Sequence, residues 1–164
     1  MLILVCGLPG TGKSSFSKEL SKRFSAVHIN SDVVRKKLFT TPSYTVEEKN
    51  TVYNDMAAQA EELLKKGKNV ILDATFFHRK YRNLMRETAG RTGVKTHLIL
   101  CYLGESETKN RIMQRKSGVS DADYEVYLKL KKEFEPIEGK HLRIDTSMPL
   151  KKRLKLVEDF IEGR

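Results

Sequence analysis

The sequence predicts an α/β fold in which helices flank a parallel β-sheet. Five short apolar runs alternate with longer segments that carry apolar residues at helical spacing, a pattern typical of successive βαβ units. Three of the runs show little apolar–polar alternation, as expected for strands buried on both faces. A glycine-rich segment, GLPGTGKSSF, stands between the first run and the first helical segment. Because ligands bind at the carboxyl ends of the strands in such sheets, functional residues are expected there.

The predicted elements follow one another in regular order along the chain. Strands are expected at the apolar runs 2–6, 27–30, 70–73, 96–103 and 141–145. Helices are expected at 13–24, within the segment HINSDVVRKKL, and at 46–66, 79–91, 105–115, 121–135 and 150–162. Gly67 ends the third of these helices and Pro136 ends the sixth.

Length and composition indicate an ordinary globular chain. Its 164 residues have the size of one domain, expected to span 1–164, with 39% apolar and 32% charged residues. No apolar run approaches 18 residues and the start lacks a basic leader region, so neither a membrane span nor a signal peptide is expected. Cys6 and Cys101 lie in apolar runs, which favours free buried thiols and a cytoplasmic location. The net charge of +10 favours an anionic partner, either a polynucleotide or a nucleotide.

The segment after the first strand fits the pattern G-x-x-x-x-G-K-[ST] of nucleotide-binding phosphate loops. Its glycines permit backbone conformations that a Cβ would block, so N–H groups and the next helix N-terminus form an anion cradle. Lys13 is expected to contact the β- and γ-phosphates of ATP or another nucleoside triphosphate, and the Ser14 hydroxyl to hold Mg²⁺. A glycine turn with a chance lysine is the alternative. The expected nucleotide-binding residues here are Gly7, Leu8, Pro9, Gly10, Thr11, Gly12, Lys13, Ser14 and Ser15.

Asp73 ends the apolar strand in NVILDATF, where an acidic residue can organise Mg²⁺. Ala74 follows it, whereas ATPases that use water usually carry an acid at that position, so a hydrolytic ATPase is disfavoured. The absence of an N-K-x-D motif disfavours a GTPase. A simple strand-end cap is the alternative for Asp73.

Asp32 and Arg35 follow the second strand and lie one helical turn apart, so they share a face. The carboxylate of Asp32 is suited to accept a proton from an attacking hydroxyl. The guanidinium of Arg35 is suited to hold a phosphate of the acceptor. The alternative is that Ser31 or Asp32 only caps the helix.

These motifs together resemble the P-loop kinases that include the polynucleotide 5′-hydroxyl kinases and the zeta-toxin kinases. The similarity is carried by GLPGTGKSSF, INSDVVRKKL, VILDATF and RIMQR, and it extends from residue 2 to about 149. It implies a P-loop kinase fold with strand order 2-3-1-4-5, a helical lid over about 105–135, and ATP and Mg²⁺ as cofactors. In that family, the residues matching Asp32 and Arg35 act as general base and as acceptor-phosphate ligand.

The resemblance also implies roles for residues in the second half of the chain. Arg111 and Arg115 share a helix face and match lid arginines that engage the ATP phosphates; a solvated basic face is the alternative. Thr146 and Ser147, after the fifth strand, match a loop that lies against adenine. The equal alternative is that these two residues do not contact the adenine.

The acceptor is expected to be the 5′-hydroxyl of DNA or RNA. The region 78–116 carries ten Lys or Arg against three Asp or Glu, and DATFFHRKYR places aromatics beside arginines. Thr75 and Arg79 are accordingly expected to bind substrate, although a solvated helix face is an equal alternative for Arg79. Two further hypotheses remain open: a P-loop kinase for a small molecule such as a sugar, nucleoside or antibiotic, and a non-enzymatic module that binds nucleotides or nucleic acid. The sequence leaves the oligomeric state open.

Overall fold

The computed structural model describes residues 1–114 and 122–164, and it contains one five-stranded parallel sheet. The strand order is β2-β3-β1-β4-β5, which confirms the predicted order and fold class. The strands are β1 (Leu2–Cys6), β2 (Ala26–Asn30), β3 (Asn69–Asp73), β4 (Thr96–Tyr102) and β5 (Leu142–Asp145). Each lies within one residue of its predicted bounds.

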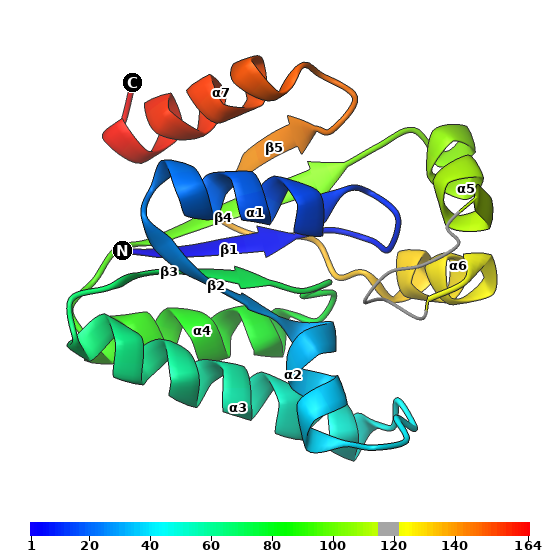
Figure 1. The fold of residues 1–164 in the computed structure, drawn as a ribbon, viewed down its shortest axis with the longest axis horizontal. Coiled ribbons are helices and arrows are strands. Elements are labelled where there is room, and N and C mark those ends of the chain that lie inside the picture. Colours follow the sequence, from blue (N-terminus) through cyan, green and yellow to red (C-terminus); the bar gives the residue numbers. More distant parts are fainter. Residues whose placement is uncertain (115–121) are drawn as a thin grey trace.

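Helices cover both faces of the sheet (Figure 1). α1 and α7 pack on one face, α3 and α4 pack on the other, and α5 and α6 lie beyond the carboxyl ends of the strands. The helices are α1 (Lys13–Arg23), α2 (Ser31–Leu38), α3 (Val46–Lys65), α4 (Arg79–Arg91), α5 (Glu105–Gln114), α6 (Tyr124–Glu133) and α7 (Leu150–Glu162). Among the described residues, no helix combines the length and the apolar character that crossing a bilayer requires.

The central strand β1 shows why an apolar run without alternation lies in the middle of the sheet. Every residue of β1 is fully buried, because its two sets of side chains enter the two cores on opposite faces. Leu2 and Leu4 pack toward α3 and α4, whereas Ile3 and Val5 pack toward α1 and α7. Cys6 and Cys101 are free and buried, as predicted.

Two helix starts differ from the sequence expectation. α6 begins at Tyr124, because the side chain of Asp123 caps it by accepting a hydrogen bond from the Val126 N–H at 2.9 Å. α2 is capped by Asn30, whose Oδ1 accepts from the N–H groups of Asp32 and Val33. Capping of α2 therefore does not require the side chains of Ser31 or Asp32.

Candidate functional site

A cleft of about 790 Å³ opens at the carboxyl ends of the strands, where the sequence predicts the site. The phosphate loop, the start of α2, the end of β3 and the two helices α5 and α6 contribute to its walls. Of the predicted site residues, the cleft is lined by Pro9, Gly10, Gly12, Lys13, Ser14, Ser15, Asp32, Arg35, Asp73, Thr75 and Arg111. The topology thus brings most of the predicted residues into one cavity.

The phosphate loop turns tightly between β1 and α1. Gly7 has φ 146°, and a Cβ there would lie 2.3 Å from the carbonyl oxygen of Cys101, so no other residue fits. Gly12 (φ 82°) forms the N-cap of α1 without a side-chain cap. The first N–H groups of a helix have no carbonyl partner within it, so this N-terminus can receive an anion. Lys13 lines the cleft, with its Nζ donating to the Leu8 carbonyl at 3.1 Å.

Asp73 lies fully buried at the floor of the cleft. Its Oδ2 accepts hydrogen bonds from Asn30 Nδ2 at 2.7 Å and from His28 Nε2 at 3.2 Å. Burial raises the pKa of Asp73, but His28, the charge of Lys13, Asn30 and Ser14 outweigh it and hold the pKa below its usual value. The carboxylate is therefore ionised at neutral pH.

Asp73 and Ser14 fit a magnesium site. Asp73 Oδ1 is buried and has no hydrogen-bond partner among the described residues, which leaves one carboxylate oxygen with an unmet lone pair. Asn30 Nδ2 lies 3.3 Å from the Ser14 hydroxyl and bonds Asp73 as well, so it holds the two oxygen groups together. Mg²⁺ is usually bound by one or two protein oxygens together with nucleotide phosphates, and this pair supplies them.

Sequence reasoning missed His28 and Asn30. A signal was available, because β2 and β3 are parallel neighbours and Asn30 pairs in register with Asp73. Polar side chains that end two adjacent parallel strands lie side by side, so HIN and ILD could have been matched from the predicted strand order.

Arg35 is buried more deeply than a substrate ligand on an open surface would be. Its guanidinium forms a buried ion pair with Glu48 of α3 and lies 4.7 Å from the centre of the Tyr44 ring. Glu48 also accepts hydrogen bonds from Ser43 N and Oγ and from Tyr44 N. Arg35 still lines the cleft, and its Nε has no partner among the described residues. The ion pair thus anchors the turn that precedes α3, a role that the sequence did not reveal.

Arg111 reaches from α5 toward the phosphate loop. A Cβ placed on Gly12 would lie 3.3 Å from Arg111 Nη1. The guanidinium of Arg111 also forms an ion pair with Glu107 at 2.8 Å. A partly exposed cation beside the loop is in position to meet a bound triphosphate. Arg115, predicted to act with it, lies outside the described residues.

Thr146 and Ser147 form contacts within the protein. Thr146 Oγ1 donates to the carbonyl of Thr11 at 2.7 Å, which ties the loop after β5 to the phosphate loop. Ser147 bonds to Asp145 through both its N–H and its hydroxyl. Neither residue lines the cleft. Their contact with adenine stays a prediction.

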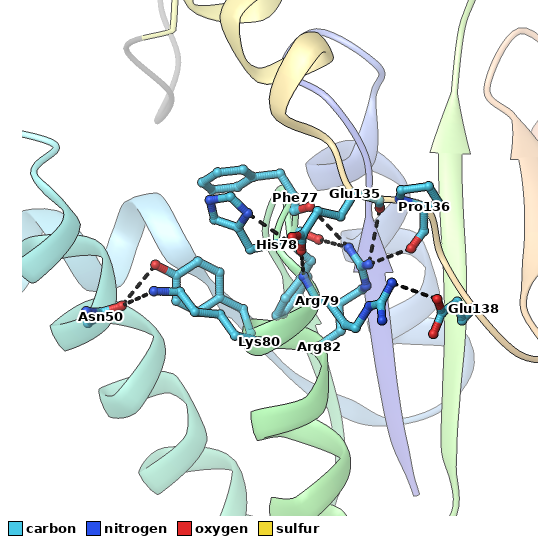
Figure 2. A network of polar contacts seen from close by, with 11 residues as sticks. Asn50, Phe77, His78, Arg79, Lys80, Arg82, Glu135, Pro136 and Glu138 are labelled. Carbon is cyan, nitrogen blue, oxygen red and sulfur yellow. Dashed lines mark hydrogen bonds and ion pairs between the residues drawn. The ribbon is translucent and has the colours of Figure 1, made fainter.

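Thr75 and Arg79 are placed differently from each other. Thr75 lines the cleft, whereas Arg79 lies outside it and pairs with Glu138 at 2.6 Å. The neighbouring Arg82 is buried and donates to the carbonyls of Phe76, Phe77, Glu135 and Pro136, a network that Figure 2 shows. The substrate role of Arg79 stays a prediction, and these arginines have partners within the chain.

A family model described as an AAA domain, AAA_33, matches residues 2–137. The chain belongs to this AAA-domain family. An uncharacterized protein of Mycobacterium bovis and two of Mycobacterium tuberculosis are each 30% identical to it in an alignment 160 residues long that covers 90% of this chain. The chain spans only 32% of the length of those relatives.

Several solved kinases share the fold of this AAA-domain chain. A sugar kinase from Janibacter matches with a TM-score of 0.78 at 15% identity, over 98% of this chain and 94% of its own. A gluconokinase from Sinorhizobium meliloti matches with a TM-score of 0.71 at 20% identity, over 98% of this chain and 91% of its own. The APS kinase of Mycobacterium tuberculosis, solved with AMPPNP and APS, matches with a TM-score of 0.74 at 18% identity, over 98% of this chain and 96% of its own. The architecture is therefore that of P-loop kinases.

The far end of the cleft contains residues that the sequence did not single out. This end is lined by Tyr44 and Tyr53 and by residues of α6. Tyr53 is held rigidly, since its ring stacks on Tyr81 at 3.8 Å and its hydroxyl accepts from the Phe76 N–H. Residues from three separate elements meet here, and no local spacing in the AAA-domain sequence indicates that. The remaining lining residues of this end are Lys49, Phe77, Val126, Lys129 and Leu130.

Proposed function

We propose that this chain is an ATP- and Mg²⁺-dependent kinase that transfers the γ-phosphate to a hydroxyl group of a small-molecule acceptor. The observation that carries the proposal is one cleft that is lined by Lys13 and Asp73, by Asp32, and by the aromatic side chains of Tyr44 and Tyr53. A phosphoryl donor and an acceptor alcohol must meet in such a space. The similarity to kinases of sugars, gluconate and APS favours a small acceptor over a polymer.

Each cleft residue has a task in this proposal. The phosphate loop and Lys13 bind the triphosphate, while Ser14 and Asp73 hold Mg²⁺. When bound, Mg²⁺ neutralises charge on the β- and γ-phosphates. The Asp32 carboxylate accepts the proton of the acceptor hydroxyl as that oxygen attacks the γ-phosphorus. Arg111, together with Arg115, stabilises the charge on the transferred group.

The same proposal assigns the lid and the remaining predicted residues. Residues 105–135 act as the lid, because α5 and α6 both contribute lining residues to the cleft. Lid helices exclude water, which favours transfer to an alcohol over hydrolysis. Thr75 contacts the acceptor, and the loop containing Thr146 and Ser147 borders the adenine. Arg35 acts on the acceptor both directly and through the turn that it anchors with Glu48.

Transfer to the 5′-hydroxyl of a polynucleotide is the second candidate. The net charge of +10 favours it, because neutralising a phosphate backbone releases counterions. Against it, Arg79, Arg82 and Arg91, which would line an acceptor groove, are paired with groups of the chain itself.

The test offers labelled ATP and Mg²⁺ with sugars, sugar acids, nucleosides, antibiotics and 5′-hydroxyl DNA and RNA oligonucleotides. We expect a labelled small-molecule product, and we expect Asp32→Asn to lower kcat by about 10²- to 10⁴-fold while ATP affinity is kept. Lys13→Ala should abolish transfer to every acceptor. Asp55→Asn, a change of a half-buried carboxylate on α3 that lines no part of the cleft, is the matched control.

Two outcomes would contradict the proposal. Full activity of Asp32→Asn would remove Asp32 as the base. Release of inorganic phosphate with no labelled acceptor, at the same rate with and without every acceptor, would instead indicate a hydrolytic ATPase.

A further inference from the structure

Two lysines from different helices, the half-buried Lys49 and the exposed Lys129, line the cleft at the end where we place the acceptor. Lys49 comes from the first turns of α3 and Lys129 from the middle of α6, and both line the same cavity. Lys49 is half-buried, and its ammonium lies 5.3 Å from the centre of the Phe77 ring. A cation that is partly removed from water without a carboxylate partner carries an unmet electrostatic cost.

No such partner is found for either lysine in the described parts of the chain. Within 4 Å of the Lys49 or Lys129 ammonium there is no carboxylate oxygen among residues 1–114 and 122–164, although ion pairs are common elsewhere on this surface. Burial lowers the pKa of Lys49, and although Glu133 and Glu48 oppose that effect, the charges of Lys129 and Arg35 add to it. Both lysines thus line the cleft without an ion pair among the described residues.

The nearest buried carboxylate is already occupied. Glu48, adjacent to Lys49 in sequence, is bound by the Arg35 guanidinium, by both donors of Ser43 and by the Tyr44 N–H. It pairs with Arg35 rather than with Lys49, and Glu133 acts on the charge of Lys49 without forming an ion pair with it in the described parts of the chain. An acceptor end with this charge repels cations and favours anions.

We infer that Lys49 and Lys129 bind an anionic group of the acceptor, namely a phosphate, sulfate or carboxylate. The inference rests on the proposed function and specifies its substrate class: a small molecule that carries both a hydroxyl and an anionic group. The hydroxyl lies at Asp32, the anionic group between the two lysines, and the body of the molecule against Tyr44, Tyr53 and Phe77.

The distance between these two groups of the acceptor is limited by the fold. Asp32 and Arg35 are one helical turn apart on α2, Arg35 contacts Glu48, and Lys49 is the next residue. This chain of contacts brings α3 against the base, so a molecule of metabolite size can reach both Asp32 and Lys49. A polymer would require cations that continue beyond this end. Arg79 and Arg82, in the first turns of α4, are already paired.

The first experiment measures anion binding without catalysis. The protein is saturated with Mg²⁺ and AMPPNP, so that the phosphate loop is filled, and sulfate or inorganic phosphate is titrated by calorimetry at constant ionic strength. We expect binding that weakens at least tenfold in Lys49→Met and in Lys129→Met, since Met keeps the length of the stem but removes the charge. Lys65→Met on α3 and Lys132→Met on α6 line no part of the cleft and should change the affinity less than twofold.

The outcomes of this titration decide the inference. AMPPNP affinity within twofold of the unmodified protein shows that each variant is folded. Equal anion affinity in the unmodified protein and in both cleft variants would overturn the anion site. No binding beyond the effect of the control salt, even at a 50-fold excess of the anion over the protein, would overturn it as well.

The second experiment uses pairs of acceptors that differ in one anionic group: gluconate and sorbitol, glucose 6-phosphate and glucose, AMP and adenosine. We expect transfer to an anionic member, and a KM for it that rises at least tenfold in Lys49→Met with an unchanged KM for ATP. Preferred transfer to a neutral member, unaffected by Lys49→Met, would overturn the anion site and leave the kinase proposal standing. Anion binding without transfer in any arm would count against the kinase instead.

A 5′-hydroxyl oligonucleotide forms the last arm. If it is phosphorylated in preference to every small acceptor, and longer strands bind more tightly, the acceptor is a polymer and the inference of a small anionic molecule is overturned.

Discussion

At the scale of single residues, Glu48 is the side chain whose importance was hidden in the sequence. It stands in a run of polar residues, VEEKN, that reads as the exposed start of a helix. In the structure it is buried and accepts bonds from Arg35, Ser43 and Tyr44. Burial raises its pKa, but the hydrogen bonds from Ser43, Arg35 and Tyr44 outweigh burial and lower the pKa to about 2.

This lowered pKa predicts how the stability of the protein depends on acid. A carboxyl whose pKa is lower in the folded than in the unfolded state stabilises the fold above its unfolded pKa, near 4.5, and this contribution is lost as the pH falls toward 2. Glu48→Gln should therefore unfold with about 3 kcal/mol less free energy at pH 7, and its loss of stability below pH 4.5 should be shallower. Urea unfolding at several pH values measures both effects.

The neighbouring Glu47 provides the control for that prediction. It is exposed in the first turn of α3, so Glu47→Gln should change the free energy of unfolding by less than about 0.5 kcal/mol and leave the acid dependence unchanged. If the two variants behave alike, Glu48 does not anchor the turn before α3.

The floor of the site was predictable because its chemistry follows from local motifs. Lys13, Ser14 and Asp73 were placed by a loop pattern and by a strand end, and the fold brings them together. Asn30 was not predicted, although it performs two tasks: its Oδ1 caps α2 and its Nδ2 holds Asp73. A side chain whose two polar atoms bond to different segments cannot be recognised from the spacing of residues in the sequence.

At the scale of elements, the start of α4 and the segment after α6 are joined by one buried arginine. Arg82 is 1% exposed and donates to four carbonyls, two in the 76–77 segment and two at Glu135 and Pro136 (Figure 2). The Glu135 N–H also donates to the Phe77 carbonyl at 2.9 Å. Since Phe77 lines the cleft, this junction links the segment after α6 to the cleft.

Removal of the arginine tests that link. Arg82→Leu leaves the four carbonyls without their donor, so we expect a loss of about 3 kcal/mol or more in the free energy of unfolding. Arg82→Lys keeps the charge but cannot reach all four carbonyls, and should lose part of that amount while raising the acceptor KM. Urea unfolding and acceptor titration measure the two effects.

A matched change lies one turn further along α4. Arg86 is less buried and makes two long hydrogen bonds, to Asn83 Oδ1 and to the Glu138 carbonyl, each at 3.3 Å, so Arg86→Leu should cost less than about 1 kcal/mol. Equal losses in the two variants would mean that the junction does not depend on Arg82.

The elements themselves were predicted nearly to the residue, but their surface chemistry was not. Apolar periodicity and glycine or proline stops determine where a helix lies, and α4 and α7 begin and end where the sequence predicts. The arginines of α4 were expected to form a basic face for an acceptor strand. Which of them are exposed depends on carbonyls and carboxylates from distant segments, such as Glu61 for Arg91 and Glu138 for Arg79, and that information is absent from local spacing.

At the scale of the whole molecule, the net charge of +10 is spread over many elements and is partly balanced within the chain. A polynucleotide acceptor requires several phosphates to be neutralised together, and each releases counterions, so its affinity falls steeply with salt. A small acceptor held by Lys49 and Lys129 engages one anionic group. The two functions therefore predict different responses to ionic strength.

We expect a shallow response. A plot of log affinity against log salt for a 5′-hydroxyl DNA 12-mer, measured with AMPPNP and Mg²⁺ present, should have a slope no steeper than about −1.5, corresponding to roughly two phosphates. Lys49→Met should flatten it further, while Lys132→Met should leave it unchanged. A slope of about −3.5 or steeper indicates five or more phosphates in contact, and would transfer the acceptor assignment from a small anionic molecule to a nucleic acid strand.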